Sequence, residues 1–324
     1  MDDSASHRIS VVVPVYQGEK TLPNLIEEIA PFTQEQRTSS GIIYWVCEVI
    51  LVHDCGPDRS DKVLEALAAK YSFVKTVWLT RNYGQHAASM AGMSSSTGDW
   101  VVTIDEDGQQ DPKDIGHMLQ TAVHSSLQVV YAKPTNTLPH GWLRNTLSKI
   151  AKVVTIKLLD REMVDFNSFR LIDGEIARTL AAYCGNRVYL DAGLIWIVSC
   201  VGHCPVKLRS ELNRPSGYSY YRLLRHFWNL ILTTGTKPLR LITLMGAISL
   251  ILAITITGYA LYWKFIRYNP VQGWTSLLII VSFFSGLTLT SLGIIAEYLA
   301  VTLGIVMGRP LYVVSTKPAR PVRK

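Results

Sequence analysis

Cysteine is scarce in this sequence: the 324 residues include only five, and these are scattered along the chain. Cys200 and Cys204 flank His203, an arrangement that could suggest a metal site. Structural zinc sites, however, combine a tighter pair of ligands with a second pair elsewhere, and the sequence has no second pair. We therefore interpret the cysteines as reduced thiols and expect no zinc-binding module.

A long apolar run is missing near the amino terminus. Residues 1–4 are acidic and polar, and the first apolar run covers only Val11–Val13. A secretory signal peptide has an apolar core of about 7–15 residues, so we expect none here and expect the first domain to remain in the cytoplasm. The sequence also contains nothing that resembles a nucleic-acid-binding module. We therefore associate the net charge of +7 with an anionic membrane surface and predict no nucleic-acid partner.

Charged residues are absent from two long apolar segments, 241–263 and 268–296. Each segment exceeds the roughly 20 residues needed to cross the hydrocarbon core of a bilayer, which predicts two transmembrane helices. The only basic residues in the loop between the two segments are Lys264 and Arg267, whereas more basic residues precede the first segment and follow the second. By the positive-inside rule, both outer ends face the cytoplasm. The basic residues outside the pair are Arg222, Arg225, Lys237, Arg240, Arg309, Lys317, Arg320, Arg323 and Lys324.

Residues 8–132 alternate between short β-rich runs and helical patterns. This alternation predicts an α/β fold in which a mostly parallel sheet carries helices on both faces. Ligands of such sheets bind beyond the carboxyl ends of the strands. The expected strands are residues 8–16, 46–52, 74–79, 100–104 and 127–131, and the expected helices are 21–30, 60–70, 85–94 and a segment that begins at Asp111-Pro112.

Two further segments, 141–159 and 220–232, have the pattern of amphipathic helices. In the second segment, aromatic and aliphatic residues share one helical face, and Arg222 and Arg225 lie on the other. Aromatic residues and arginines directly before a membrane span favour a helix that lies in the membrane interface. Packing of these helices against the soluble domain remains open as the alternative.

Two carboxylates, Asp105 and Asp107, directly follow the apolar run Trp100–Ile104. A strand that ends in this way delivers both carboxylates to the carboxyl edge of the sheet, where they can share one divalent cation with the phosphates of a nucleotide. An isolated Asp-x-Asp is more often a solvated acidic turn. Here three other polar clusters also end strands, which favours a common ligand site. These clusters are residues 13–19, 52–58 and 81–86.

The order of the four clusters resembles that of nucleotide-sugar-binding glycosyltransferases. The chain is similar to the polyprenyl-phosphate glycosyltransferases of glycosyltransferase family 2, which are related to dolichyl-phosphate mannose synthase. It is most similar to the bacterial branch that charges undecaprenyl phosphate with glucose or formyl-aminoarabinose. The resemblance covers nearly the whole chain and includes residues 236–240, 296–298 and 308–312 around the apolar segments. It implies a GT-A fold, which is Rossmann-like with a mostly parallel sheet.

The resemblance also divides the chain. It implies a cytoplasmic GT-A catalytic domain over residues 1–215 and a juxtamembrane amphipathic helix over 216–238. A transmembrane region of two helices follows over 239–300, and a cytoplasmic tail covers 301–324. We therefore expect a multi-pass protein of the bacterial inner membrane.

The resemblance assigns nucleotide binding to the turn after the first strand. The family's Pro-x-Tyr-Asn-Glu turn, which holds the nucleotide, matches Pro14, Tyr16 and Gln17. The acidic position of that turn falls on Gly18. Glu19 is the next residue, and its substitution for the missing acidic group is left open.

The family's Asp-Asp-Gly-Ser-Pro-Asp turn, which contacts the base, is matched only loosely by residues 53–58. His53 replaces the first aspartate, so the resemblance places the base contact on Asp54. Arg81 and Asn82 are expected to shape the base and sugar pocket. The altered turns leave the identity of the nucleotide open.

The family's Asp-Ala-Asp-Leu-Gln metal motif matches Asp105, Asp107 and Gln109. The match implies that Asp107 and Gln109 bind Mg²⁺ or Mn²⁺ and that Asp105 lies toward the nucleotide. The candidate catalytic residues are these two aspartates together with Asp165 and Arg170.

The resemblance places acceptor and phosphate binding later in the chain. Asp165 is the candidate for binding sugar hydroxyls or orienting the acceptor, and Arg170 is the candidate for contacting a phosphate. A structural ion pair is the alternative for these two. Arg209 and Arg214, with Ser216, match a basic loop of the family that closes over the diphosphate. Arginine suits this role because its guanidinium can donate two parallel hydrogen bonds to phosphate. The alternative for the two arginines is contact with anionic lipid.

The function that the resemblance implies is metal-dependent, inverting transfer of a sugar from a nucleotide sugar to undecaprenyl or another polyprenyl phosphate. A UDP-linked donor is favoured, and a mannose synthase that uses GDP-mannose is the alternative. A membrane scaffold with a decayed transferase domain is a further alternative. A processive polysaccharide synthase is disfavoured, because the Gln-x-x-Arg-Trp motif is absent. Expected partners are the membrane, a homo-oligomer such as a tetramer, a separate flippase and a downstream glycosyltransferase.

Overall fold

The computed structural model describes residues 6–136, 166–185, 190–209, 273–308 and 310–318, together with scattered positions between 246 and 262. The chain forms two compact units. The first contains residues 1–149, 161–219 and 310–324, and the second contains 150–160 and 220–309. The amphipathic segments predicted at 141–159 and 220–232 lie outside the described residues, as do Asp165, Arg214 and Ser216.

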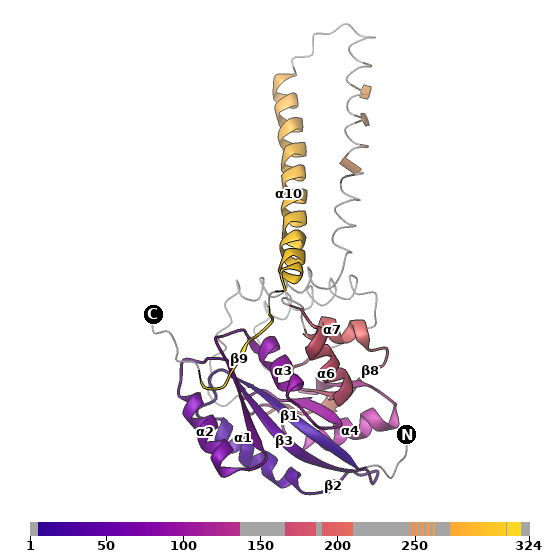
Figure 1. The fold of residues 1–324 in the computed structure, drawn as a ribbon. Coiled ribbons are helices and arrows are strands. Elements are labelled where there is room, and N and C mark those ends of the chain that lie inside the picture. The colour runs from indigo at the N-terminus through magenta and orange to yellow at the C-terminus, as the bar shows by residue number, and fades with distance from the viewer. Residues whose placement is uncertain are drawn as a thin grey trace. The chain divides into compact units, whose positions relative to one another are not determined.

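The described part of the first unit is built on a nine-stranded sheet in which the main path runs β8-β6-β7-β5-β1-β3-β4-β9 and β2 pairs with β3 (Figure 1). The pairs β1–β3, β1–β5, β3–β4 and β6–β8 are parallel, which confirms the predicted α/β fold with a mostly parallel sheet. The strands are β1 (His7–Val15), β2 (Gln36–Arg37), β3 (Ile43–His53), β4 (Val74–Leu79), β5 (Trp100–Thr103), β6 (Val129–Pro134), β7 (Arg170–Asp173), β8 (Val201–Val206) and β9 (Val314–Ser315).

Helices cover both faces of this sheet. Successive residues of a strand point to opposite faces, so Val11 and Val13 of β1 join one apolar cluster and Val12 joins another. The first cluster includes residues of α1, α2 and α4, and the second includes residues of α3, α6 and α7. The helices of this unit are α1 (Leu22–Ile29), the short 3-10 helix η1 (Ala30–Thr33), α2 (Ser60–Lys70), α3 (Gln85–Ser94), α4 (Asp114–His124), α6 (Gly174–Tyr183) and α7 (Leu190–Ile197).

Four strands of the sheet, β2, β7, β8 and β9, were not anticipated from the sequence. The strand β7 runs antiparallel between β5 and β6, so the sheet is mixed rather than wholly parallel. The strand β9 lies after α10, and it pairs antiparallel with β4 through Trp78↔Ser315 and Leu79↔Val314. Leu311 and Tyr312 pack against the second apolar cluster. The segment 310–318 therefore closes this edge of the sheet, where β4 would otherwise expose unpaired backbone groups.

The second unit contains one long apolar helix among its described residues, α10 (Trp274–Val306), which has 33 residues. By length and composition its window Phe283–Ala300 could cross a bilayer, and within the described positions no other helix meets this test. The predicted second span, 268–296, falls mostly on this helix, which continues well past the predicted end. The predicted first span, 241–263, lies largely outside the described residues, so a pair of spans is not confirmed.

Candidate active site

The carboxyl ends of the parallel strands β1, β3 and β5 meet at one edge of the sheet. The turn after β1 is joined to the turn after β3, because the Asp54 N–H donates to the Val15 carbonyl at 2.8 Å. Gly56 lies directly against the Tyr16 carbonyl, and a Cβ at this glycine would come within 1.4 Å of that oxygen. Close approach of the two turns therefore requires glycine at position 56.

Asp105 is held by donors from three parts of the chain. The Gln85 side chain at the start of α3 donates to Oδ1 at 2.6 Å, and Gln110 donates to Oδ2 at 2.9 Å. The Ser168 hydroxyl, just before β7, also donates to Oδ2. Burial raises the pKa of Asp105 to about 6, the Ser168 hydrogen bond opposes this rise, and the charge of Asp107 adds to it. Sequence reasoning identified Asp105 but missed the three residues that fix it.

Asp107 and Gln109 lie in the loop between Asp105 and α4. The Gln109 N–H donates to Asp107 Oδ1 at 3.0 Å, which closes a tight turn. The described residues contain no group of three or more His, Cys, Asp or Glu side chains that could hold a metal by themselves. Mg²⁺ is usually bound by one or two carboxylates together with substrate phosphates. The carboxylate of Asp107 and the side-chain amide of Gln109 are oxygen donors of the kind that such a shared site uses, so they are the candidate metal ligands of this loop.

Glu106, which lies between these two aspartates, contacts the turn after β1. Its carboxylate accepts hydrogen bonds from the Tyr16 N–H at 3.0 Å and the Gln17 N–H at 2.9 Å. Glu106 was not among the residues expected at the site from the sequence. No periodic or spacing signal distinguishes it, because its role depends on how two distant loops meet.

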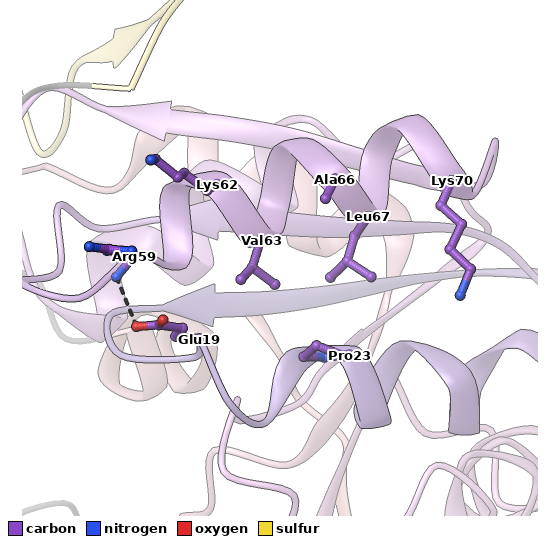
Figure 2. Close-up of a pocket in the computed structure, with 8 residues that line it drawn as sticks. All are labelled: Glu19, Pro23, Arg59, Lys62, Val63, Ala66, Leu67 and Lys70. Carbon is purple, nitrogen blue, oxygen red and sulfur yellow. Dashed lines mark hydrogen bonds between the residues drawn. The ribbon is translucent and has the colours of Figure 1, made fainter.

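Glu19 contacts the turn that precedes α2. Its Oε2 accepts a hydrogen bond from the Arg59 N–H at 3.2 Å (Figure 2). The Glu19 N–H donates to Asp58 Oδ2 at 3.1 Å. Glu19 also lines a shallow groove between α1 and α2, where Val63 and Leu67 form part of the wall (Figure 2). The carboxylate that accepts the Tyr16 and Gln17 N–H groups is therefore that of Glu106. The Glu19 carboxylate instead accepts from Arg59, in the turn before α2.

Asp54 holds the loop that follows β4. It is buried, and its two carboxylate oxygens accept hydrogen bonds from the Tyr83 N–H at 2.7 Å and the Gly84 N–H at 2.8 Å. In the same loop, the Arg81 guanidinium lies over the Tyr83 ring, 4.8 Å from its centroid, and Asn82 is exposed. Arg81, Asn82 and Asp54 are thus brought to one region. His53, in contrast, is buried with its ring against Trp78.

The ionisation of Asp54 leads to a prediction about pH and stability. Burial raises the pKa of Asp54 to about 6, and the two backbone hydrogen bonds only partly oppose this. The folded state therefore retains a proton between about pH 4 and 6 that the unfolded chain loses, so this group's contribution to stability falls as pH rises through that range. We expect the Tm of the wild type, relative to Asp54→Asn, to rise as pH is lowered from 7 to 4. Thermal unfolding in detergent measures this, and parallel pH profiles would contradict it.

Arg170 has a buried partner in the structure. Its side chain is buried in β7, forms an ion pair with Asp191 of α7, and donates from Nε to Thr103 Oγ1 at 3.1 Å. The Tyr131 hydroxyl donates to the same Asp191 carboxylate at 2.9 Å. This arrangement favours the structural ion pair that the sequence left open for Arg170, with Asp191 as its acidic member. Arginine at a strand start gives no sequence signal of burial, so the sequence did not identify this partner.

Arg209 lies against the metal-motif loop. Its N–H donates to the Gln109 carbonyl at 2.8 Å, and its guanidinium forms ion pairs with Glu28 and Asp111, both at 2.7 Å. The side chain is 36% exposed, so it is accessible from solvent. To contact a phosphate, the guanidinium would have to release one of these two carboxylates.

Comparison with known proteins identifies the class. The model of glycosyl transferase family 2 matches residues 10–181, which cover β1 to α6 and all the strand ends described above. The chain belongs to this family, and the prediction that it is a family 2 glycosyltransferase is confirmed.

Two particular proteins show how far the similarity extends. Undecaprenyl-phosphate 4-deoxy-4-formamido-L-arabinose transferase of Proteus mirabilis is 28% identical over 94% of this chain and 92% of its own length. Among solved structures, glucosyl-3-phosphoglycerate synthase of Mycobacterium tuberculosis has a TM-score of 0.50 and 19% identity, covering 70% of this chain and 78% of its own. That structure contains Mn²⁺ and UDP-glucose, and at this identity it shows a shared fold.

Proposed function

We propose that this protein transfers a sugar from a nucleotide sugar, with UDP as the favoured nucleotide, to undecaprenyl or another polyprenyl phosphate at the cytoplasmic face of the bacterial inner membrane. The observation that carries the proposal is the extent of the similarity to the Proteus transferase. That similarity covers 94% of the chain, whereas the family model ends at residue 181. It therefore includes the carboxyl-terminal third, where the apolar helix α10 lies.

The site supports a direct displacement at the anomeric carbon. A phosphate monoester has a second pKa of about 6 and is largely dianionic at neutral pH, so the acceptor needs no strong general base. The main electrostatic requirement is to stabilise the charge that develops on the departing diphosphate. A bound Mg²⁺ or Mn²⁺ supplies this charge stabilisation. A single displacement inverts the anomeric centre, so an α-linked donor gives a β-linked lipid product.

The described residues have distinct parts in this scheme. Asp107 and Gln109 would hold the metal, and Asp105 is fixed beside them by Gln85, Gln110 and Ser168. Pro14 and Tyr16 would border the nucleotide. Asp54 would fix the loop that carries Arg81 and Asn82, which form the base side of the pocket.

The membrane is required by the chemistry of the acceptor. Each CH₂ of a prenyl chain contributes about 0.8 kcal/mol to its residence in the bilayer, so the lipid phosphate stays at the membrane surface. The apolar helix α10, with a candidate span at Phe283–Ala300, would anchor the catalytic unit there. A second span and an oligomer such as a tetramer remain parts of the proposal, together with a separate flippase and a downstream glycosyltransferase.

Transfer of radiolabelled sugar to undecaprenyl phosphate in membranes tests the proposal. We expect an organic-extractable product from one donor among UDP-glucose, UDP-galactose, UDP-N-acetyl sugars and GDP-mannose. EDTA should abolish the product, and Mg²⁺ or Mn²⁺ should restore it. The acidic loop at 105–109 cannot stabilise the negative charge of the departing diphosphate without a bound cation. A product from GDP-mannose alone would favour a mannose synthase. No product from a broad set of donors, with folded protein, would contradict the proposed reaction.

A further inference from the structure

Gly18 lies at the point where the turn after β1 enters α1, and it is buried. Its backbone is engaged on both sides. The Gly18 N–H donates to the Ser60 hydroxyl at 2.9 Å, and its carbonyl accepts from the Leu22 N–H at 3.0 Å. The position of this residue is therefore fixed by the fold, and a side chain added here could not move away as part of a loose loop.

The space beside Gly18 is already occupied by another residue's carboxylate. A Cβ at position 18 would lie 2.8 Å from Glu106 Oε2 and 2.7 Å from the Leu22 side chain. The same Glu106 carboxylate accepts the Tyr16 and Gln17 N–H groups. Positions 18 and 106 thus share a space that holds one acidic side chain, and in this chain the side chain comes from position 106.

This arrangement is an exchange relative to the family motifs that the chain resembles. Those motifs place glutamate at the position of Gly18 and alanine at the position of Glu106, whereas this chain has the small and the acidic residue interchanged. We propose that Glu106 is a positioning residue: from the metal-motif loop it supplies the carboxylate that the turn after β1 lacks, and it fixes these two loops to each other for donor binding. This inference rests on the proposed function, since it concerns the same nucleotide and metal site.

The chemistry of the contact explains why it would affect donor binding. Hydrogen bonds from backbone N–H groups to a carboxylate are charge-assisted and roughly twice as strong as neutral ones. Glu106 lies between Asp105 and Asp107 in the metal-motif loop. Its hydrogen bonds to the Tyr16 and Gln17 N–H groups therefore set the distance between this loop and the nucleotide-binding turn. A donor that bridges the two with its nucleoside and its diphosphate would bind to a preorganised site.

A double-mutant cycle on the full-length protein in detergent tests the inference. The variants are Glu106→Ala, Gly18→Glu and the double variant, with Glu106→Gln as the conservative change. Glu27→Ala is the matched control, because Glu27 is an exposed residue of α1 whose ion pair with Lys70 measures 3.7 Å. The measurements are the Kd of UDP in the presence of Mn²⁺, the KM and kcat for the donor, and the Tm without metal or nucleotide.

We expect each single variant to weaken UDP binding and raise the donor KM by about tenfold, and the double variant to recover part of this loss, because Glu106→Ala removes one of the two close contacts at position 18 and leaves the contact with Leu22. Glu106→Gln should be intermediate, because its amide oxygen can still accept from one N–H group. The control should match the wild type. The effect on kcat should be smaller than that on KM, because Glu106 acts on the site through the loops.

Two results would overturn the inference. One is an additive double variant, in which the two losses multiply instead of cancelling. The other is a change in Tm alone, with unchanged Kd and KM, which would make the contact purely structural. The Kd of UDP across the variants also separates this inference from the proposed reaction. If the wild type binds UDP with Mn²⁺ but transfers no sugar, the proposed reaction is refuted, and the UDP affinities of the variants still test the role of Glu106. A wild type that binds neither UDP nor GDP refutes both.

Discussion

Asp107→Asn is expected to reduce the rate of sugar transfer by about 10²–10³-fold, the loss that follows when one strong electrostatic contact to the developing charge is removed. The asparagine side chain can still accept the Gln109 N–H that Asp107 Oδ1 accepts at 3.0 Å, so the turn should be preserved. What is lost is the negative charge that would hold the divalent cation. The initial rate at saturating donor, measured over a range of Mn²⁺ concentrations, gives the size of the effect.

Asp99→Asn is the matched control for this change. Asp99 forms an exposed ion pair with Arg8 at 3.1 Å, at the amino end of β5, and so lies at the opposite end of the strand from Asp107. The control should transfer sugar at the wild-type rate. If Asp107→Asn retained full activity at low Mn²⁺, the assignment of Asp107 as a metal ligand would be refuted.

Asp191→Ala is expected to lower the free energy of unfolding by about 3–5 kcal/mol, the range measured when one member of a buried ion pair is removed. The change leaves the Arg170 guanidinium buried without its acidic partner and removes the acceptor of the Tyr131 hydroxyl. The double variant Arg170→Met with Asp191→Leu should recover much of this loss, because apolar residues can replace a buried pair at little cost. Thermal and urea unfolding of the full-length protein in detergent measures both.

The exposed pair between Arg8 and Asp99 provides the comparison for that experiment. Side chains of this pair are 48% and 43% exposed, so Asp99→Ala should cost less than about 1 kcal/mol. Equal losses from Asp99→Ala and Asp191→Ala would contradict the buried role of the Arg170–Asp191 pair. A double variant that loses sugar transfer while it folds normally would return Arg170 to the candidate phosphate contacts.

Much of the fold could be read from the sequence because it depends on local patterns. Alternation of β-rich runs and helices predicted the strands β1, β3, β4, β5 and β6 and a mostly parallel sheet, and the Asp105–Asp107 pair marked the end of β5. The strands β2, β7, β8 and β9 were not predicted. Three of these pair with strands distant in the chain: β7 with β5 and β6, β8 with β6, and β9 with β4.

The candidate site likewise contains residues that the local sequence indicated and residues whose roles depend on distant contacts. The residue types at the strand ends pointed to Asp54, Asp105 and Asp107, because carboxylates at that edge have an obvious use. Their supports could not be found, since Ser168 is 63 residues from Asp105 in sequence and Glu106 meets a turn 90 residues away. The ion pair of Arg170 could not be assigned for a related reason: burial of a charged side chain depends on a partner, Asp191, which only the folded chain identifies.

The pairing of β9 with β4 also restricts how the chain can pass through a bilayer. Residues 1–149, 161–219 and 310–324 belong to one folded unit, and the segment 220–309 between its last two parts includes α10. A segment that leaves one side of a membrane and returns to the same folded unit must cross the membrane an even number of times. An anchor in which α10 alone crossed the bilayer would place β9 on the side of the membrane opposite β4, so such an anchor is incompatible with the β9–β4 pair.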